Sequence, residues 1–160
     1  MQNNFHYEIE RKFLVNEINF PLDQFPSAEI IQGYISEPED EVTIRLRKIN
    51  DKYFRTLKKR GLESRLESEV EISEKEFNAD WDKTERKRIR KTRYKIPYET
   101  YTIELDIFHE HLEGLIIAEV EFDTIADCKL FIPPSWFGQE VTNKKEFSNS
   151  YLSFYGYKKL

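Results

Sequence analysis

Polar and apolar residues alternate along most of the chain with a period of two, the pattern of a strand whose faces meet different surroundings. Between His6 and Val15, one face carries Glu8, Glu10 and Lys12, and the other face is largely apolar. Seven further stretches are strand candidates. They are 29–36, 42–49, 53–59, 65–72, 88–98, 101–108 and 115–123. Short polar turns separate several of them, which favours antiparallel neighbours.

Helix signals are fewer than strand signals. Ser73 and Glu76 form a capping-box pattern that predicts a helix carrying Phe77 and Trp81. Shorter helices are expected at 124–130, before two prolines, and within 148–157. Antiparallel strands with a few helices make an α+β domain, and eight strands are enough to close a β-barrel. We expect residues 1–160 to form one domain, because the length suits a single core.

Composition narrows the choice of partners and compartment. The net charge of −5 argues against a general nucleic-acid binder. The single cysteine, Cys128, excludes an internal disulfide and fits a reducing compartment. No apolar run approaches membrane-spanning length. We therefore expect a cytoplasmic protein with no membrane or nucleic-acid partner; the sequence leaves its oligomeric state open.

Charged residues make up 34% of the chain, and they gather on shared strand faces rather than scattering. The acidic faces carry Glu8, Glu10, Glu67, Glu69, Glu71, Glu104, Asp106, Glu119 and Glu121. The basic faces carry Lys12, Arg45, Arg47, Lys58, Lys91, Arg93 and Lys95. The opposite faces are apolar in several strands, so one side of the wall would pack a core and the other would be ionic.

Two interpretations of the charged faces compete. In the simpler one they face water, as one face of an antiparallel sheet commonly does. However, Glu-x-Glu recurs at Glu8/Glu10, Glu69/Glu71 and Glu119/Glu121, and such neighbours repel unless a cation lies between them. Hard cations such as Mg²⁺ or Mn²⁺ take carboxylate and phosphate oxygens, and Arg and Lys bind phosphate. The combination therefore favours metal-phosphate chemistry.

The segment from Glu8 to Val15 resembles the Glu-x-Glu-x-Lys signature that opens proteins of the CYTH, or triphosphate tunnel metalloenzyme, family. The resemblance continues in order along nearly the whole chain. It includes Gln32-Gly33-Tyr34, Arg45-Leu46-Arg47, Thr56-Leu57-Lys58, Glu69-Val70-Glu71, Lys91-Thr92-Arg93-Tyr94, Glu104 to Phe108, Gly114 to Glu121, Trp136 to Thr142 and Asn149. The chain departs from the family at His109, Asn143, Glu146 and Phe147, which leaves the tunnel residues intact.

This resemblance implies an eight-stranded antiparallel tunnel with a charged interior and a few flanking helices. It implies Mg²⁺ or Mn²⁺ as cofactor and a small triphosphate as substrate. The implied metal ligands are Glu8, Glu10, Glu119 and Glu121, with Asp106, Glu69 and Glu71 as weaker candidates. The implied phosphate-binding residues are Lys12, Arg45, Arg47, Lys58, Lys91 and Arg93. Those expected to act in catalysis are Glu8, Glu10, Lys12, Glu119 and Glu121.

The leading functional hypothesis is hydrolysis of inorganic tripolyphosphate, or a related triphosphate, to phosphate and a diphosphate. A family adenylyl cyclase and a thiamine triphosphatase would use the same ionic residues. A non-catalytic module that binds polyphosphate or nucleotides would need the basic residues but not the carboxylates. A purely structural β-domain would show no stabilisation by metal.

Overall fold

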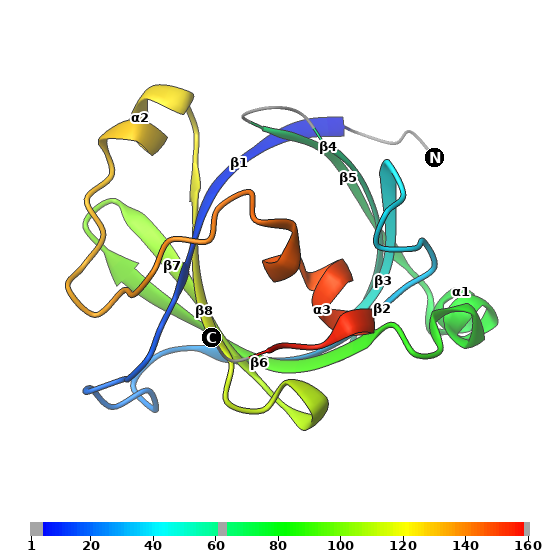
Figure 1. Ribbon diagram of the computed structural model, residues 1–160. Coiled ribbons are helices and arrows are strands. Elements are labelled where there is room, and N and C mark those ends of the chain that lie inside the picture. The colour runs from blue at the N-terminus through cyan, green and yellow to red at the C-terminus, as the bar shows by residue number, and fades with distance from the viewer. Residues whose placement is uncertain (1–4, 61–63, 159–160) are drawn as a thin grey trace.

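Eight antiparallel strands close into a barrel in the computed structural model, which describes residues 5–60 and 64–158 (Figure 1). The strands neighbour one another in the order β1-β5-β4-β3-β2-β6-β7-β8, and β8 returns to β1. Their bounds are β1 (Phe5–Leu14), β2 (Ser27–Tyr34), β3 (Val42–Ile49), β4 (Lys52–Arg60), β5 (Arg65–Ile72), β6 (Arg88–Tyr98), β7 (Tyr101–Phe108) and β8 (Ile116–Phe122). The predicted barrel and its strands are confirmed.

The register of the strands sets the charged faces side by side on the inner wall. On β1 and β8, Glu10 lies opposite Glu121 and Lys12 lies opposite Glu119. Because side chains alternate across a strand, each such pair shares one face of the wall. The barrel interior is therefore ionic.

The apolar core lies outside the barrel wall. Its largest part includes Phe13, Leu105, Val120 and Phe131, against which residues of the 18–25 and 128–137 segments pack. A smaller part joins Leu46 and other residues of the wall to the first helix. Burial of these side chains supplies the main favourable term in folding and leaves the interior free for polar groups.

Within the described residues, three α-helices and three 3₁₀-helices flank the barrel. They are α1 (Glu74–Trp81), α2 (Ile125–Leu130), α3 (Asn149–Tyr155), η1 (Asp82–Thr84), η2 (Glu110–Leu112) and η3 (Lys145–Phe147). The predicted capping box begins α1, with reciprocal bonds between Ser73 and Glu76. Gly33 allows this region to approach the wall, because a Cβ there would lie 2.6 Å from the Thr84 side chain. In the described ranges, 5–60 and 64–158, no helix is long and apolar enough to cross a membrane.

The third helix, α3, lies across one end of the barrel against β2 and β6 (Figure 1). Its Leu152 is fully buried in an apolar cluster with Tyr34, Ile89, Phe108 and Ile117. These four residues share strand faces with the ionic residues, so the same faces change from charged to apolar at this end. The C-terminal segment thus closes the barrel with an apolar contact.

Candidate active site

The barrel encloses a cavity of about 250 Å³ whose walls are almost entirely charged. Of the residues that the structure describes, seven carboxylates line it: Glu8, Glu10, Glu67, Glu69, Glu104, Glu119 and Glu121. Six cationic side chains line it as well: Lys12, Arg45, Arg47, Lys58, Arg65 and Arg93. Buried charges cost free energy unless they are paired or bind a ligand, so this concentration of ions marks the cavity as the candidate active site.

Three carboxylates converge at one place on the wall. Candidate ligand oxygens of Glu8, Glu10 and Glu121 all lie within 4.8 Å of one another. Burial raises the pKa of Glu8 and of Glu10. Desolvation and the repulsion of Glu8, Glu104 and Glu10 raise the pKa of Glu121 to about 7. Three oxygen donors whose negative charges repel one another fit a hard divalent cation, which would relieve the repulsion.

The remaining carboxylates predicted as ligands have different surroundings. Glu119 pairs with Lys12 at 3.3 Å. Burial opposes its ionisation, but Lys12, Arg93 and Lys91 outweigh that effect and hold its pKa well below the ordinary value. Glu119 lies on the β8 face beside the converging carboxylates without belonging to that group.

Asp106 does not line the cavity and is almost fully buried. Its two carboxylate oxygens accept hydrogen bonds from Arg93 at 2.7 and 2.9 Å, and Lys91 lies 2.8 Å away. Burial opposes ionisation, yet Arg93 and Lys91 lower the pKa of Asp106. The arrangement makes Asp106 a partner that orients two cations.

The two predicted ligands on β5 diverge. Glu69 lines the cavity and accepts hydrogen bonds from Thr56 at 2.9 Å and Arg45 at 3.3 Å. Glu71 follows on the same face of β5, but it lies opposite Phe54 and does not line the cavity. The structure therefore does not bring Glu71 to the other carboxylates.

Two lysines predicted to bind phosphate reach the cavity. Lys58 lies 3.0 Å from Glu8 and 3.4 Å from Glu67, so it stands directly beside the converging carboxylates. Lys12 donates to the Phe147 carbonyl at 3.2 Å and thereby connects β1 to the C-terminal segment. Both ammonium groups are placed where an anion in the cavity would meet them.

Arg47 is the buried cation with the weakest compensation. Its Nε donates to the Gln32 side chain at 3.2 Å, and within the described ranges it has no ion-pair partner. Burial, together with repulsion from Arg45 and Arg93, lowers the pKa of Arg47 to about 10. The Nε of Arg45 is also buried without a hydrogen-bond partner. Guanidinium groups held in this way indicate a place for an anion.

Lys91 differs from the other predicted phosphate-binding residues. Its side chain is completely buried against Asp106 and donates to the Asn149 side chain of α3 at 3.3 Å. Burial lowers the pKa of Lys91 to about 7, although Asp106 opposes the change. Because Lys91 does not line the cavity, it supports Asp106 and the N-terminal end of α3 in this structure.

Two openings lie beside the segment that covers one end of the barrel. The first is bounded by Glu8, Glu10, Arg65 and residues 141–144. The second is bounded by Arg45, Lys58, Arg65 and residues 148–150. Glu104 and Glu121 also border a wider space of about 620 Å³. Each of these three spaces shares lining residues with the cavity.

Among the described residues, four polar side chains that line the cavity were absent from the predicted site. Glu67 and Glu104 belong to the predicted acidic faces, where their position two residues from Glu69 and Asp106 was the available signal. Arg65 shares the inward face of β5 but precedes the Glu-x-Glu pair, so no pattern distinguished it. Asn149 was noted in the sequence only as part of the family pattern, and it now lies at the cavity wall.

Comparison with known proteins agrees with this geometry. The CYTH domain model matches residues 6–142. The chain belongs to the CYTH-domain family. An inorganic triphosphatase of Nitrosomonas europaea is 43% identical over 148 residues, covering 91% of this chain and 96% of that protein. A second inorganic triphosphatase, from Acetivibrio thermocellus, is 38% identical over 152 residues, covering 91% and 92%.

A solved structure of an inorganic triphosphatase shares the fold of this CYTH chain. Its TM-score is 0.67 at 40% sequence identity, and the match covers 91% of this chain and 93% of that one. The predicted family and tunnel fold are thereby confirmed.

Proposed function

We propose that the protein hydrolyses inorganic tripolyphosphate to phosphate and diphosphate in the barrel cavity, with Mg²⁺ or Mn²⁺ as cofactor. The observation that carries the proposal is that a carboxylate cluster and incompletely paired guanidinium groups line the same small cavity. Glu8, Glu10 and Glu121 converge on one side, and the incompletely paired guanidinium groups of Arg45 and Arg47 lie in the same cavity. Two relatives named inorganic triphosphatase, which match this chain over most of their length, support the proposal.

Phosphate oxygens would be held chiefly by the basic residues of β3, β4 and β6. Arg45 and Arg47 offer guanidinium donors, which match phosphate geometry, and Lys58 adds a compact charge between the arginines and the carboxylates. Arg93 is already oriented by Asp106 and Glu104, so its position is fixed before substrate binds. These residues would bind the substrate and stabilise the negative charge that builds up on the leaving diphosphate.

The carboxylates would supply the other half of the site. Glu8, Glu10 and Glu121 would hold the cation, which in such sites polarises phosphoryl oxygens and acidifies a bound water. Water then attacks the terminal phosphorus, the bridging P–O bond breaks, and the proton released by water leaves with solvent or product. Glu119 orients Lys12 through their 3.3 Å ion pair. Catalysis in this scheme rests on positioning and electrostatics.

An inorganic substrate suits the cavity better than a nucleotide does. Nearly every lining residue is charged, with one apolar residue, Ile49, in the set. A nucleobase gains affinity mainly by stacking and by hydrogen bonds to its edges, which this lining does not provide. The cluster of Glu8, Glu10 and Glu121 in turn argues against a module that only binds polyphosphate, because the binding of an anion needs the basic residues alone.

A substrate comparison tests this function. Purified protein is given tripolyphosphate, ATP or thiamine triphosphate at equal concentration, with Mg²⁺, Mn²⁺ or excess chelator, and all products are identified. We expect kcat/KM for tripolyphosphate to exceed that for ATP by at least about tenfold. A higher kcat/KM for ATP or thiamine triphosphate, or cyclic AMP with diphosphate as main products, would overturn the proposal and leave the fold untouched.

A further inference from the structure

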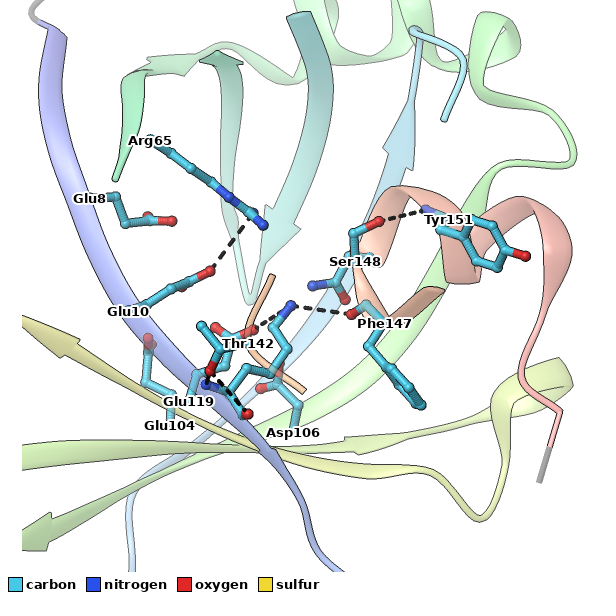
Figure 2. Close-up of polar contacts among 12 residues, drawn as sticks. Glu8, Glu10, Arg65, Glu104, Asp106, Glu119, Thr142, Phe147, Ser148 and Tyr151 are labelled. Atoms are coloured by element: carbon cyan, nitrogen blue, oxygen red, sulfur yellow. Dashed lines mark hydrogen bonds and ion pairs between the residues drawn. The ribbon is translucent and has the colours of Figure 1, made fainter. Parts of the chain in front are cut away.

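Arg65 lies where the carboxylates, the basic wall and both openings beside the C-terminal segment meet. It begins β5 and lies directly opposite Glu8 in the pairing of β5 with β1. Its side chain lines the central cavity and each of the two openings. Figure 2 shows it reaching across from β5 toward Glu10 on β1. Neither the sequence pattern nor the ion pairs of the basic wall gives it a role in the proposed reaction.

The contact between Arg65 and Glu10 is unusually loose for this cavity. Their closest atoms, Nη1 and Oε1, are 3.7 Å apart, which is too far for a hydrogen bond. By comparison, Lys58 lies 3.0 Å from Glu8, and Arg93 lies 2.7 Å from Asp106. In the part of the chain described by the structure, Arg65 has no other ion-pair partner. A guanidinium with five donors and one distant acceptor is free to change partners.

Glu10 is the carboxylate for which Arg65 and a divalent cation would compete. It belongs to the converging group with Glu8 and Glu121, and Glu8 is already shared with Lys58. A cation bound there would neutralise Glu10 and weaken its attraction for Arg65. The opening lined by Arg65 also contains Arg45 and Lys58, so an anion held by those two residues lies within the reach of the released guanidinium.

We propose that Arg65 is a substrate-binding residue that exchanges partners: it pairs loosely with Glu10 in the free protein and binds a substrate phosphate once a divalent cation occupies the carboxylates. This role rests on the proposed triphosphatase function and deepens it. The cation and tripolyphosphate would then each increase the affinity for the other, because the binding of either one already breaks the contact between Arg65 and Glu10. Arg65 would thus couple the two halves of the site.

The test measures cation binding and substrate binding separately. Mn²⁺ alone is titrated calorimetrically into wild-type protein and Arg65→Ala, without any phosphate. Removing the competing cation should tighten Mn²⁺ binding roughly two- to fivefold. Removing a guanidinium from the bound phosphate should instead raise KM for tripolyphosphate about tenfold, with a smaller change in kcat. Opposite changes in the two affinities are the signature of exchange.

Two further variants make the result specific. Arg65→Lys keeps the charge but loses the planar fork, so Mn²⁺ affinity should stay near wild type while KM rises. Arg90→Ala is the matched control, because it removes an ion pair of the same 3.7 Å length, to Glu110, outside the cavity. It should change neither quantity, and thermal unfolding checks that each variant is folded.

Unchanged or weaker Mn²⁺ binding in folded Arg65→Ala would overturn the exchange, and so would an unchanged KM for tripolyphosphate. Failure of the proposed function looks different. In that case wild-type protein does not hydrolyse tripolyphosphate at all, whatever Mn²⁺ affinity the variants show.

Discussion

Replacing Arg47 by methionine should stabilise the ligand-free protein while damaging its binding site. Arg47 is buried with Gln32 as its hydrogen-bond partner, and its pKa is lowered to about 10. That lowering corresponds to a penalty of roughly 3 kcal/mol on the charged side chain in the folded protein. At pH 7 the side chain is protonated in both folded and unfolded chains, so the whole penalty applies. It is relieved only as the pH rises above about 10.

The substitution has a cost of its own. Gln32 loses the donor to its side-chain oxygen, and an unsatisfied buried acceptor costs about 1–3 kcal/mol. Set against the penalty of roughly 3 kcal/mol, this cost leaves a net gain between about zero and about 2 kcal/mol, because methionine fills similar space without the charge. For a chain of this size, the gain raises Tm by up to about 8 °C.

Thermal unfolding with and without tripolyphosphate, in the absence of divalent cations, measures both effects. Tripolyphosphate should raise the Tm of wild-type protein and have much less effect on Arg47→Met. Lys48→Met is the control, because Lys48 is the next residue on β3, points to the opposite face and lies over the Tyr53 ring. If Arg47→Met had a lower Tm than the wild-type protein, and tripolyphosphate still raised the Tm of the variant fully, Arg47 would not be a destabilising cation that binds the anion.

The remaining predictions concern the carboxylates and the apolar end of the barrel. Glu10→Gln should keep the wild-type fold by circular dichroism yet lose most activity, since an amide lacks the charge that a cation needs; a wild-type rate at saturating metal would contradict this. Apparent Mn²⁺ affinity should rise between pH 6 and 8, because the raised pKa of Glu121 keeps a proton on its carboxylate below about pH 7, and that proton competes with the cation. Glu121→Gln should flatten this pH dependence. A flat pH profile in the wild-type protein would contradict a ligand role for Glu121. Leu152→Ala should lower the free energy of unfolding by about 2–5 kcal/mol in denaturant titrations; a loss below about 1 kcal/mol would show that α3 does not close the barrel by packing.

Alternation alone was enough to predict the strands of the barrel wall, whereas closure into a tunnel was implied by the family resemblance. The strands at 42–49, 65–72, 88–98 and 101–108 match the structure residue for residue. A period of two fixes which residues share a face, so it followed directly that Glu8, Glu10 and Lys12 point to the same side. The capping box at Ser73 likewise placed the start of α1, because its bonds are local.

Alternation could not predict how far along the barrel each charge would lie. Glu71 and Glu69 share a face, yet only Glu69 borders the cavity. Lys91 and Arg93 share a face as well, but Lys91 is sealed beneath α3 by Asp106 and Asn149. The position of a side chain along the barrel depends on the stagger of the strands and on where the C-terminal segment packs, and both are set by contacts between residues distant in sequence. For the same reason, the sequence could not predict that Arg65 lines the cavity.

The central claim is that this cavity hydrolyses a phosphoanhydride bond with the help of a divalent cation. Phosphorus NMR of tripolyphosphate incubated with the purified protein tests it most directly, with Mg²⁺ or Mn²⁺ and, in parallel, after removal of metal with excess chelator. We expect phosphate and diphosphate in equal amounts with metal and no turnover in chelator. Intact tripolyphosphate in the presence of either metal, or equal turnover in chelator, would contradict it.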